Sequence, residues 1–434
     1  MSGIGTPGVT PSVGSGLTPT RSRSRRLLRR SSFTIGDLEV RAGRSEIGDL
    51  PISRLVTGTQ ISLPLNVLHG RHDGPIVWLS AAVHGDEIGG VEIIRRALGS
   101  IDPRDLSGTI VAVPIVNVHG FLNGDRYLPD RRDLNRSFPG SATGSLAARV
   151  AHLFMQEIVA RCEVGIDLHT GSDHRTNLPQ IRADLDDRTT RELAVAFGAP
   201  LMMHAQLRDG SMRAAATSAG STVLLYEGGE AWRYDRAAID AGTTGVRRVL
   251  IHLGMIEPAE SPVDQHQTPV ETRSSGWVRA RRSGIALLDV ELGQMVERGQ
   301  TVATVRDAVG RRLSTTKASR TGMVIGHIMQ PLVNQGDAII HIADVAGAGD
   351  TSDVDPVGAD PGDVEPDGAA PAGADPDVAG VDAGPDIRSA PPTGSDGAPD
   401  RAAPPGSAAD STIHPGPADT TIDDRGDGPT PITT

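Results

Sequence analysis

Two histidines and a glutamate, each placed after an apolar stretch, are the residues whose types and spacing first suggest chemistry. His84 and Glu87 stand three positions apart in AAVHGDEIGG, directly after PIVWLSAAV. His169 follows a second apolar stretch, in IDLHTG. Two imidazoles and one carboxylate, with a fourth position open to water or substrate, are the ligand set of a catalytic zinc ion. The pattern therefore favours a metal site, although each residue alone could be an ordinary turn residue.

Two further clusters carry groups that a metal-dependent hydrolase needs. In the arginine-rich loop GDRYLPDRRDLNRSFPG, Asn135 and Arg136 suggest a clamp for a carboxylate, because the planar guanidinium matches that group. Glu227 ends the apolar stretch STVLLYE and precedes two glycines, where the backbone can turn sharply. A carboxylate beside zinc can act as general base, although an acid in this position is often a turn residue or a helix cap. Glu230 is the competing candidate for the same role.

Residues 76–255 alternate between strand-like and helix-like patterns that can bring these side chains together. Apolar stretches predict strands at 75–83, 108–116, 162–169, 201–205 and 221–227. Helices are predicted at 145–162, near 187–198 and near 235–253. Such alternation predicts an α/β domain with a mixed, largely parallel sheet and flanking helices, in which ligands gather at the carboxyl ends of strands.

Residues 276–344 are rich in β patterns and contain a weak internal repeat. The stretch that begins at Gly284 matches the stretch that begins at Gly322, and Gly299 then aligns with Gly336. Two such halves predict a small β-sandwich or barrel similar to biotinyl and lipoyl domains. The hairpin between the halves, RDAVGRRL, contains no lysine, which argues against attached biotin or lipoate.

Composition separates the folded part from two tails. Residues 1–32 contain six arginines and no acid, whereas residues 346–434 contain 18 acids and three arginines and account for the net charge of −12. Neither segment has enough apolar surface to offset its ordering entropy, so both are expected to be disordered. The domains expected between them are 33–265, catalytic, and 270–345, β-rich. Cys162 is the only cysteine, which excludes an intrachain disulfide and a cysteine-based zinc site.

Four motifs, HGDE, RY followed by DLNRSFPG, DLHT and EGG, occur in this order. Together they resemble the succinylglutamate desuccinylase/aspartoacylase family of the zinc carboxypeptidase-like superfamily. The resemblance covers roughly residues 50–345, including the carboxyl-terminal β region. It implies a zinc carboxypeptidase-like fold with one zinc ion per chain.

The resemblance implies a role for individual residues of these motifs. It implies that His84, Glu87 and His169 are the zinc ligands. It implies that Glu227 activates the attacking water and then protonates the departing amine. Arg126 would stabilise the oxyanion that develops on the scissile carbonyl.

Further residues of the same motifs would hold the substrate and orient the ligands. Asn135 and Arg136 would bind a substrate carboxylate. Asp133 would orient the first zinc histidine. Asp167 would do the same for the histidine on the second strand of the site.

Some assignments stay open at this point. Arg131 and Arg132 lie in the same loop as Arg126 and compete with it for the oxyanion role. Arg175 and Asn177 follow the DLHT motif and could line the pocket.

The expected activity is zinc-dependent hydrolysis of the amide or ester bond of a small carboxylate-bearing substrate, in the first place an N-acyl amino acid. In the resembling family the β domain narrows the entrance, which favours small substrates. The alternatives are a zinc carboxypeptidase acting on short peptides and a non-catalytic metal-binding protein. No apolar stretch has the length of a membrane span, and the arginines of the head lack interleaved aromatic residues. A cytoplasmic protein that binds neither membrane nor nucleic acid is therefore expected.

Overall fold

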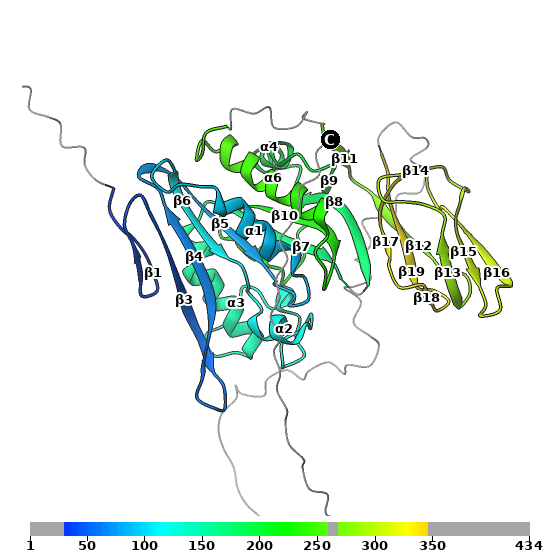
Figure 1. Ribbon diagram of the computed structural model, residues 1–434, viewed down its shortest axis with the longest axis horizontal. Coiled ribbons are helices and arrows are strands. Elements are labelled where there is room, and N and C mark those ends of the chain that lie inside the picture. Colours follow the sequence, from blue (N-terminus) through cyan, green and yellow to red (C-terminus); the bar gives the residue numbers. More distant parts are fainter. Residues whose placement is uncertain (1–29, 173, 259–267, 346–434) are drawn as a thin grey trace, which may run out of the picture. The chain divides into compact units, whose positions relative to one another are not determined.

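The computed structural model describes residues 30–172, 174–258 and 268–345 (Figure 1). The acidic tail and nearly all of the basic head, both expected to be disordered, lie outside these ranges. The main sheet has 13 strands. Ten of them follow one another in space in the order β12 (Ser275–Arg279), β19 (Ala338–Ala343), β17 (Gly322–Ile328), β8 (Arg175–Ala183), β10 (Thr222–Glu230), β7 (Val164–Gly171), β5 (His72–Ala81), β6 (Ser107–Val113), β4 (Gln60–His69) and β3 (Arg44–Arg54). The other three, attached beside this path, are β9 (Leu201–His204), β11 (Val270–Thr272) and β14 (Met295–Val296).

The centre of this sheet is parallel, as the sequence predicts. Strand β10 runs parallel to β7, β7 to β5 and β5 to β6, whereas β8 and β4 pair antiparallel at the two sides of this block. The α/β class with a largely parallel central sheet is therefore confirmed. The long β3–β4 hairpin was not predicted, because its strands carry polar and proline residues between the buried positions.

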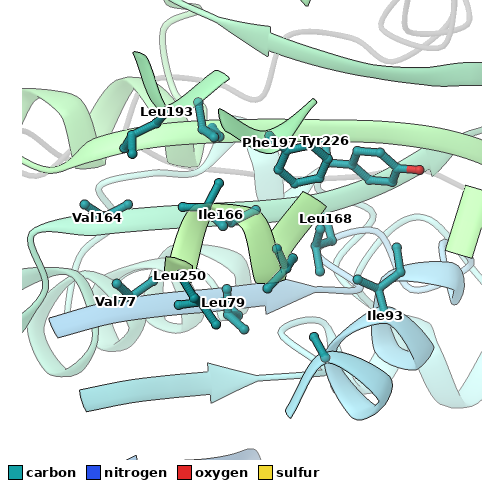
Figure 2. Packing of buried hydrophobic residues seen from close by; sticks show 14 of the residues in the cluster. Val77, Leu79, Ile93, Val164, Ile166, Leu168, Leu193, Phe197, Tyr226 and Leu250 are labelled. Carbon is teal, nitrogen blue, oxygen red and sulfur yellow. The ribbon is translucent and has the colours of Figure 1, made fainter. Parts of the chain in front are cut away.

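Helices cover both faces of the sheet. They are α1 (Gly89–Gly99), α2 (Val118–Asn123), α3 (Leu146–Glu157), α4 (Arg188–Phe197), α5 (Met212–Ser218) and α6 (Arg236–His252), with short 3-10 turns η1 (Leu134–Arg136) and η2 (Val159–Arg161). Alternation along β5 divides the core: Val77 and Leu79 pack with α1, α4 and α6 (Figure 2), whereas Trp78 packs with α3 and α5. The helices predicted near 145–162, 187–198 and 235–253 correspond to α3, α4 and α6.

Short polar side chains define where most of these helices begin. Ser145, Asp187, Ser211 and Asp235 precede α3, α4, α5 and α6, and each accepts a hydrogen bond from a backbone N–H in the first turn. Helix α4 ends at Gly198, which adopts a left-handed conformation.

Helix α1 was not predicted, because two glycines open it. A side chain on Gly90 would place its Cβ 2.8 Å from the carbonyl oxygen of Leu168. Glycine is therefore used here for close packing of the helix against β7, at the cost of a weak helical signal. None of the helices in the described ranges is long and apolar enough to cross a membrane.

The carboxyl-terminal β region confirms the internal repeat. A second sheet has the order β16 (Arg312–Lys317), β15 (Thr301–Arg306), β13 (Gly284–Leu288) and β18 (Leu332–Val333). Gly284 of β13, in the first half, pairs with Val333 of β18, in the second half. Conversely, Gly322 of β17, in the second half, pairs with Val296 of β14, in the first half. Each half therefore lends a short strand to the other, and a shared apolar core lies between the two sheets.

The proposed catalytic domain and the proposed β-rich domain share the main sheet. Strand β17 pairs antiparallel with β8, with Gly326 opposite Asn177 and Ile328 opposite Arg175. The remaining pair, β1 (Phe33–Ile35) and β2 (Leu38–Val40), forms a small separate hairpin. Backbone hydrogen bonds therefore join the β region directly to the strands that carry the polar site described below.

Phe154 of α3 is the position where we expect the core to be most sensitive. Its ring is fully buried and lies edge-on to Trp78, with centroids 5.6 Å apart, and to Phe138, with centroids 6.2 Å apart. We predict that Phe154→Ala lowers the free energy of unfolding by roughly 3–5 kcal/mol, because it removes these contacts and leaves a cavity. Phe154→Leu should cost clearly less, since most of the volume stays filled. Equal midpoints in urea unfolding for the two variants would contradict this prediction.

Candidate active site

Three polar side chains converge where strands β5 and β7 end. His84 and Glu87 lie in the turn after β5, and His169 lies near the end of β7. The two oxygens of Glu87 are shared between the imidazoles: Oε1 is 2.7 Å from His84 Nδ1, and Oε2 is 2.8 Å from His169 Nδ1. One ligand atom from each of the three residues lies within 4.8 Å of the others, and all three side chains are buried. The geometry and the donor types fit a divalent cation.

The turn that carries His84 and Glu87 depends on a close backbone contact. A Cβ on Gly85 would lie 2.0 Å from the carbonyl carbon of Gly120 in α2. Ala82 at the start of the turn has a positive φ of 48°. The chain therefore bends tightly against α2, which directs both side chains back over the sheet edge.

A carboxylate also faces the second nitrogen of each imidazole. Asp133 Oδ1 is 3.2 Å from His84 Nε2, and Asp167 Oδ2 is 2.8 Å from His169 Nε2. Asp167 is itself held by Ser80, whose hydroxyl donates to Oδ1 over 2.5 Å. The structure thus places both carboxylates against the rings that they were predicted to orient. Contacts of this kind set the tautomer of a ligating histidine.

The pKa values of the cluster reflect these contacts. Burial by itself raises the pKa of Glu87, but the two imidazoles outweigh it and hold that pKa far below its usual range. Burial and the nearby Arg126 lower the pKa of His84, yet Glu87 and Asp133 together raise it to about 9. The pKa of His169 is likewise raised well above its ordinary value, against the effect of burial, by Asp167 and Glu87. The site is therefore built to hold positive charge between carboxylates.

Glu227 lies on the neighbouring strand, directly opposite His169 in the β10–β7 pairing. Its Oε2 accepts a hydrogen bond of 3.1 Å from Asn177 Nδ2, and its Oε1 is 3.8 Å from a guanidinium nitrogen of Arg182. Glu227 lines the same cavity as the three converging residues. Glu230, the competing candidate, instead lies 3.7 Å from Arg233 and is outside the cavity lining formed by the described residues.

Of the three competing arginines, Arg126 is the one placed at the site. Its Nη1 is 3.4 Å from Glu87 Oε1, and its Nη2 donates to Asp133 Oδ2 over 3.1 Å. Arg131 and Arg132 are exposed at the surface of the loop.

Asn135 and Arg136 both line the cavity, but their polar groups also have structural partners. Asn135 Oδ1 accepts a 2.9 Å hydrogen bond from the backbone N–H of Met212, at the start of α5. Arg136 Nη1 donates to the carbonyl oxygen of Asn135 over 2.7 Å. The first of these contacts joins the arginine-rich loop to α5, and the second lies within the loop.

The cavity has a volume of about 450 Å³ and a cationic lining. Among the described residues that line the cavity, Glu87 and Glu227 are the acidic ones. Six arginines surround them: Arg126, Arg136, Arg182, Arg208, Arg213 and Arg273. Such a lining favours an anionic ligand.

Several of these residues were missed because no local motif marks them. Arg182 and Arg213 come from β8 and α5, and His341 comes from β19 of the carboxyl-terminal region. Arg213 is buried and donates to the carbonyl oxygens of Ala205 and Gln206 over 2.9 and 2.7 Å, which shapes the cavity wall. Burial lowers the pKa of Arg213 to about 10.

The two residues after the DLHT motif that could have lined the pocket, Arg175 and Asn177, lie outside the described cavity lining. Asn177 is buried and contacts Glu227 from the side of β8, whereas Arg175 lies over the ring of Trp277, 5.5 Å from its centroid. Neither belongs to the described lining of the cavity, which decides the possibility that the sequence left open. Both residues lie on β8, which pairs with β17 of the carboxyl-terminal β region.

Comparisons with known proteins show which proteins this chain is similar to. Residues 73–253 match the family described as Succinylglutamate desuccinylase/Aspartoacylase catalytic domain. The N-alpha-acetyl-L-2,4-diaminobutyric acid deacetylase of Halomonas elongata is 29% identical over 296 residues, which cover 66% of this chain and 86% of that protein. A succinylglutamate desuccinylase/aspartoacylase structure from Rhodobacter sphaeroides superimposes with a TM-score of 0.62 at 25% identity and covers 70% of this chain and 97% of that one. The product-bound ectoine utilization protein EutE of Ruegeria pomeroyi shares the fold, with a TM-score of 0.62 at 24% identity, covering 73% of this chain and 96% of that one.

The outer carboxylates lead to a prediction about metal affinity. We predict that Asp133→Asn weakens Zn²⁺ binding by about 10- to 100-fold, because the amide holds His84 less firmly and makes its ring less basic. Competition with a chromophoric chelator would measure the affinity. Asp130→Asn is the matched control, since Asp130 lies in the same loop and accepts hydrogen bonds from the backbone N–H groups of Arg132 and Ala147. Equal losses for the two variants would exclude a specific role of Asp133.

Proposed function

We propose that the chain, as a member of the succinylglutamate desuccinylase/aspartoacylase family, is a zinc-dependent hydrolase that releases the acyl group of a small N-acyl amino acid. The observation that carries this proposal is the convergence of His84, Glu87 and His169 with Glu227 in one cationic cavity. A relative named as a deacetylase of an N-acetylated amino acid supports the same reaction class.

His84, Glu87 and His169 would hold the zinc ion. Both Nδ1 atoms face Glu87, while the Nε2 atoms face Asp133 and Asp167. In this arrangement each Nε2–H donates to an outer carboxylate, and each Nδ1 lone pair is available to the cation. When bound, zinc would polarise the scissile carbonyl and lower the pKa of a water molecule.

Glu227 would take the proton from the attacking water and deliver it to the departing amine nitrogen. Its position opposite His169 places the carboxylate beside the proposed zinc ligands. The 3.1 Å hydrogen bond from Asn177 holds one of its oxygens, which supports a defined orientation of the base.

Arginines of the cavity would hold the negative charges of the reaction. Arg126, fixed between Glu87 and Asp133, would meet the charge that develops on the carbonyl oxygen. Arg136 would bind the substrate carboxylate, for which a guanidinium fork is suited. Asn135 Oδ1 accepts from Met212, and Asn135 would offer its Nδ2 group to the substrate carboxylate, because a carboxylate binds hydrogen-bond donors.

A hydrolysis screen tests the proposal directly. We expect the zinc-loaded protein to hydrolyse at least one N-acyl amino acid in a panel that varies both acyl group and amine. A chelator should abolish turnover and added Zn²⁺ should restore it, as measured by release of the free amine. Cleavage of short peptides without any cleavage of N-acyl amino acids would favour a carboxypeptidase instead. Absence of bound zinc and of all turnover would favour a non-catalytic protein.

The role of Glu227 leads to a second prediction. Glu227→Gln should lower turnover by about 10²- to 10⁴-fold, since the amide cannot accept the proton of water, while zinc content stays at the wild-type level. Glu230→Gln is the control, because Glu230 is outside the described cavity lining. The proposed base is wrong if Glu227→Gln retains most of the activity, or if the two variants lose activity equally.

A further inference from the structure

The carboxylate of Glu227 is held by a residue outside the described lining of the cavity. Asn177 of β8 donates to it over 3.1 Å, and both side chains are buried. Strand β10 has an irregularity between Glu227 and Gly229, and Asn177 pairs with Gly229. The contact between the Asn177 amide and the Glu227 carboxylate therefore lies where the pairing of β10 with β8 is irregular.

On its other edge, β8 pairs with β17 of the carboxyl-terminal region, and Gly326 lies opposite Asn177. A Cβ on Gly326 would lie 2.9 Å from Asn177 Oδ1 and 3.3 Å from the carbonyl oxygen of Thr176. Gly326 is not among the residues with positive φ, so its backbone conformation is open to any residue. The need for glycine here comes from the space that the Asn177 amide occupies.

The far side of β17 is tightly packed. His341 of β19 pairs with Gly326, and its Cβ would lie 3.5 Å from a Cβ at that position. The ring of His341 stacks on Trp277, with centroids 4.5 Å apart at 11°, and its Nε2 is 2.9 Å from the hydroxyl of Ser275. Because β17 is packed between this group and β8, a side chain added at Gly326 would displace the amide of Asn177 rather than the strand.

From these contacts we propose that Gly326 and Asn177 are positioning residues for Glu227. The carboxyl-terminal β region then controls the orientation of the base through the β8–β17 pairing, in addition to lending His341 to the cavity wall. This inference rests on the proposed role of Glu227 as general base.

The inference predicts a selective kinetic effect. A displaced Asn177 amide leaves Glu227 Oε2 without this donor, and the carboxylate can then turn toward Arg182, whose Nη1 is 3.8 Å from Oε1. Misorientation of a reacting group lowers the rate of the chemical step. Substrate binding should be unaffected, because the cavity lining defined by the described residues includes neither Gly326 nor Asn177.

The experiment is a double-mutant cycle in the zinc-loaded full chain. Gly326→Ala and Asn177→Ala should each lower kcat by about 10- to 100-fold, with KM within about twofold of wild type and zinc content unchanged. The double variant should have the kcat of Asn177→Ala alone, because alanine at position 177 has no Oδ1 for the added Cβ to meet. Independent, multiplicative losses would show that Gly326 does not act through Asn177 and would overturn the proposal.

Gly276→Ala is the control for a glycine-to-alanine change in the same β region. The nearest atoms that a Cβ there would meet belong to the guanidinium group of Arg320, which is bound to Ser274 and Asp344. The change therefore disturbs the packing of the same region without a contact to the Asn177 amide, so wild-type kcat is expected. A loss equal to that of Gly326→Ala would mean that general destabilisation of the region explains the effect, and the proposal would fail.

Crystal structures of the wild type and Gly326→Ala give a readout that needs no turnover. In the variant the distance from Asn177 Nδ2 to Glu227 Oε2 should exceed hydrogen-bonding range, and an unmoved amide would refute the inference. If Glu227→Gln abolishes turnover while Asn177→Ala retains full kcat, this inference fails and the proposed function stands. If no N-acyl amino acid is cleaved by the wild type, the proposed function fails. The crystal structures alone then decide whether Gly326 controls the position of the Asn177 amide.

Discussion

The shared carboxylate of Glu87 is the interaction on which the site depends. One oxygen contacts His84 within its own turn, and the other contacts His169 on a different strand, 82 positions further along the chain. This contact requires β5 and β7 to be adjacent and parallel, so that their carboxyl ends meet. It also requires the tight turn at Gly85, which brings Glu87 back over the sheet edge.

Burial of this cluster explains much of the surrounding polar structure. Charged groups removed from water are tolerated only when they are paired and hydrogen-bonded. Asp133 and Asp167 meet the outer nitrogens of the two imidazoles, Ser80 supports Asp167, and Arg126 supports Asp133. The arginine-rich loop therefore has a structural reason to fold over the sheet edge, separate from any contact with substrate.

The carboxyl-terminal β region is bound to the site by backbone pairing and by side chains. Strand β17 extends the sheet beyond β8, and His341 reaches the cavity wall from the next strand. A hydrogen-bonded sheet therefore joins this region to the neighbourhood of Glu227. This arrangement makes the repeat of two β halves part of the architecture around the cavity.

Local patterns in the sequence were enough to identify the central strands, three of the helices, the β repeat and the residues that converge at the strand ends. These features carry local signals: apolar stretches that stop at a polar residue, helical spacing, and glycines at equivalent positions such as Gly299 and Gly336. Helix α1 and the β3–β4 hairpin were not predicted, because close packing at Gly90 and polar residues within the strands weaken the local signal.

Only the tertiary structure decided which residue contacts Glu227 and which distant residues complete the cavity wall. Asn177 of β8 meets Glu227 where the pairing of β10 is irregular, and Gly326 meets Asn177 because β17 pairs with the other edge of the same strand. Arg213 and His341 reach the cavity from elements without any motif. Contacts of this kind depend on strand order and register between distant segments, and those are set by packing of the whole chain rather than by any short stretch of it.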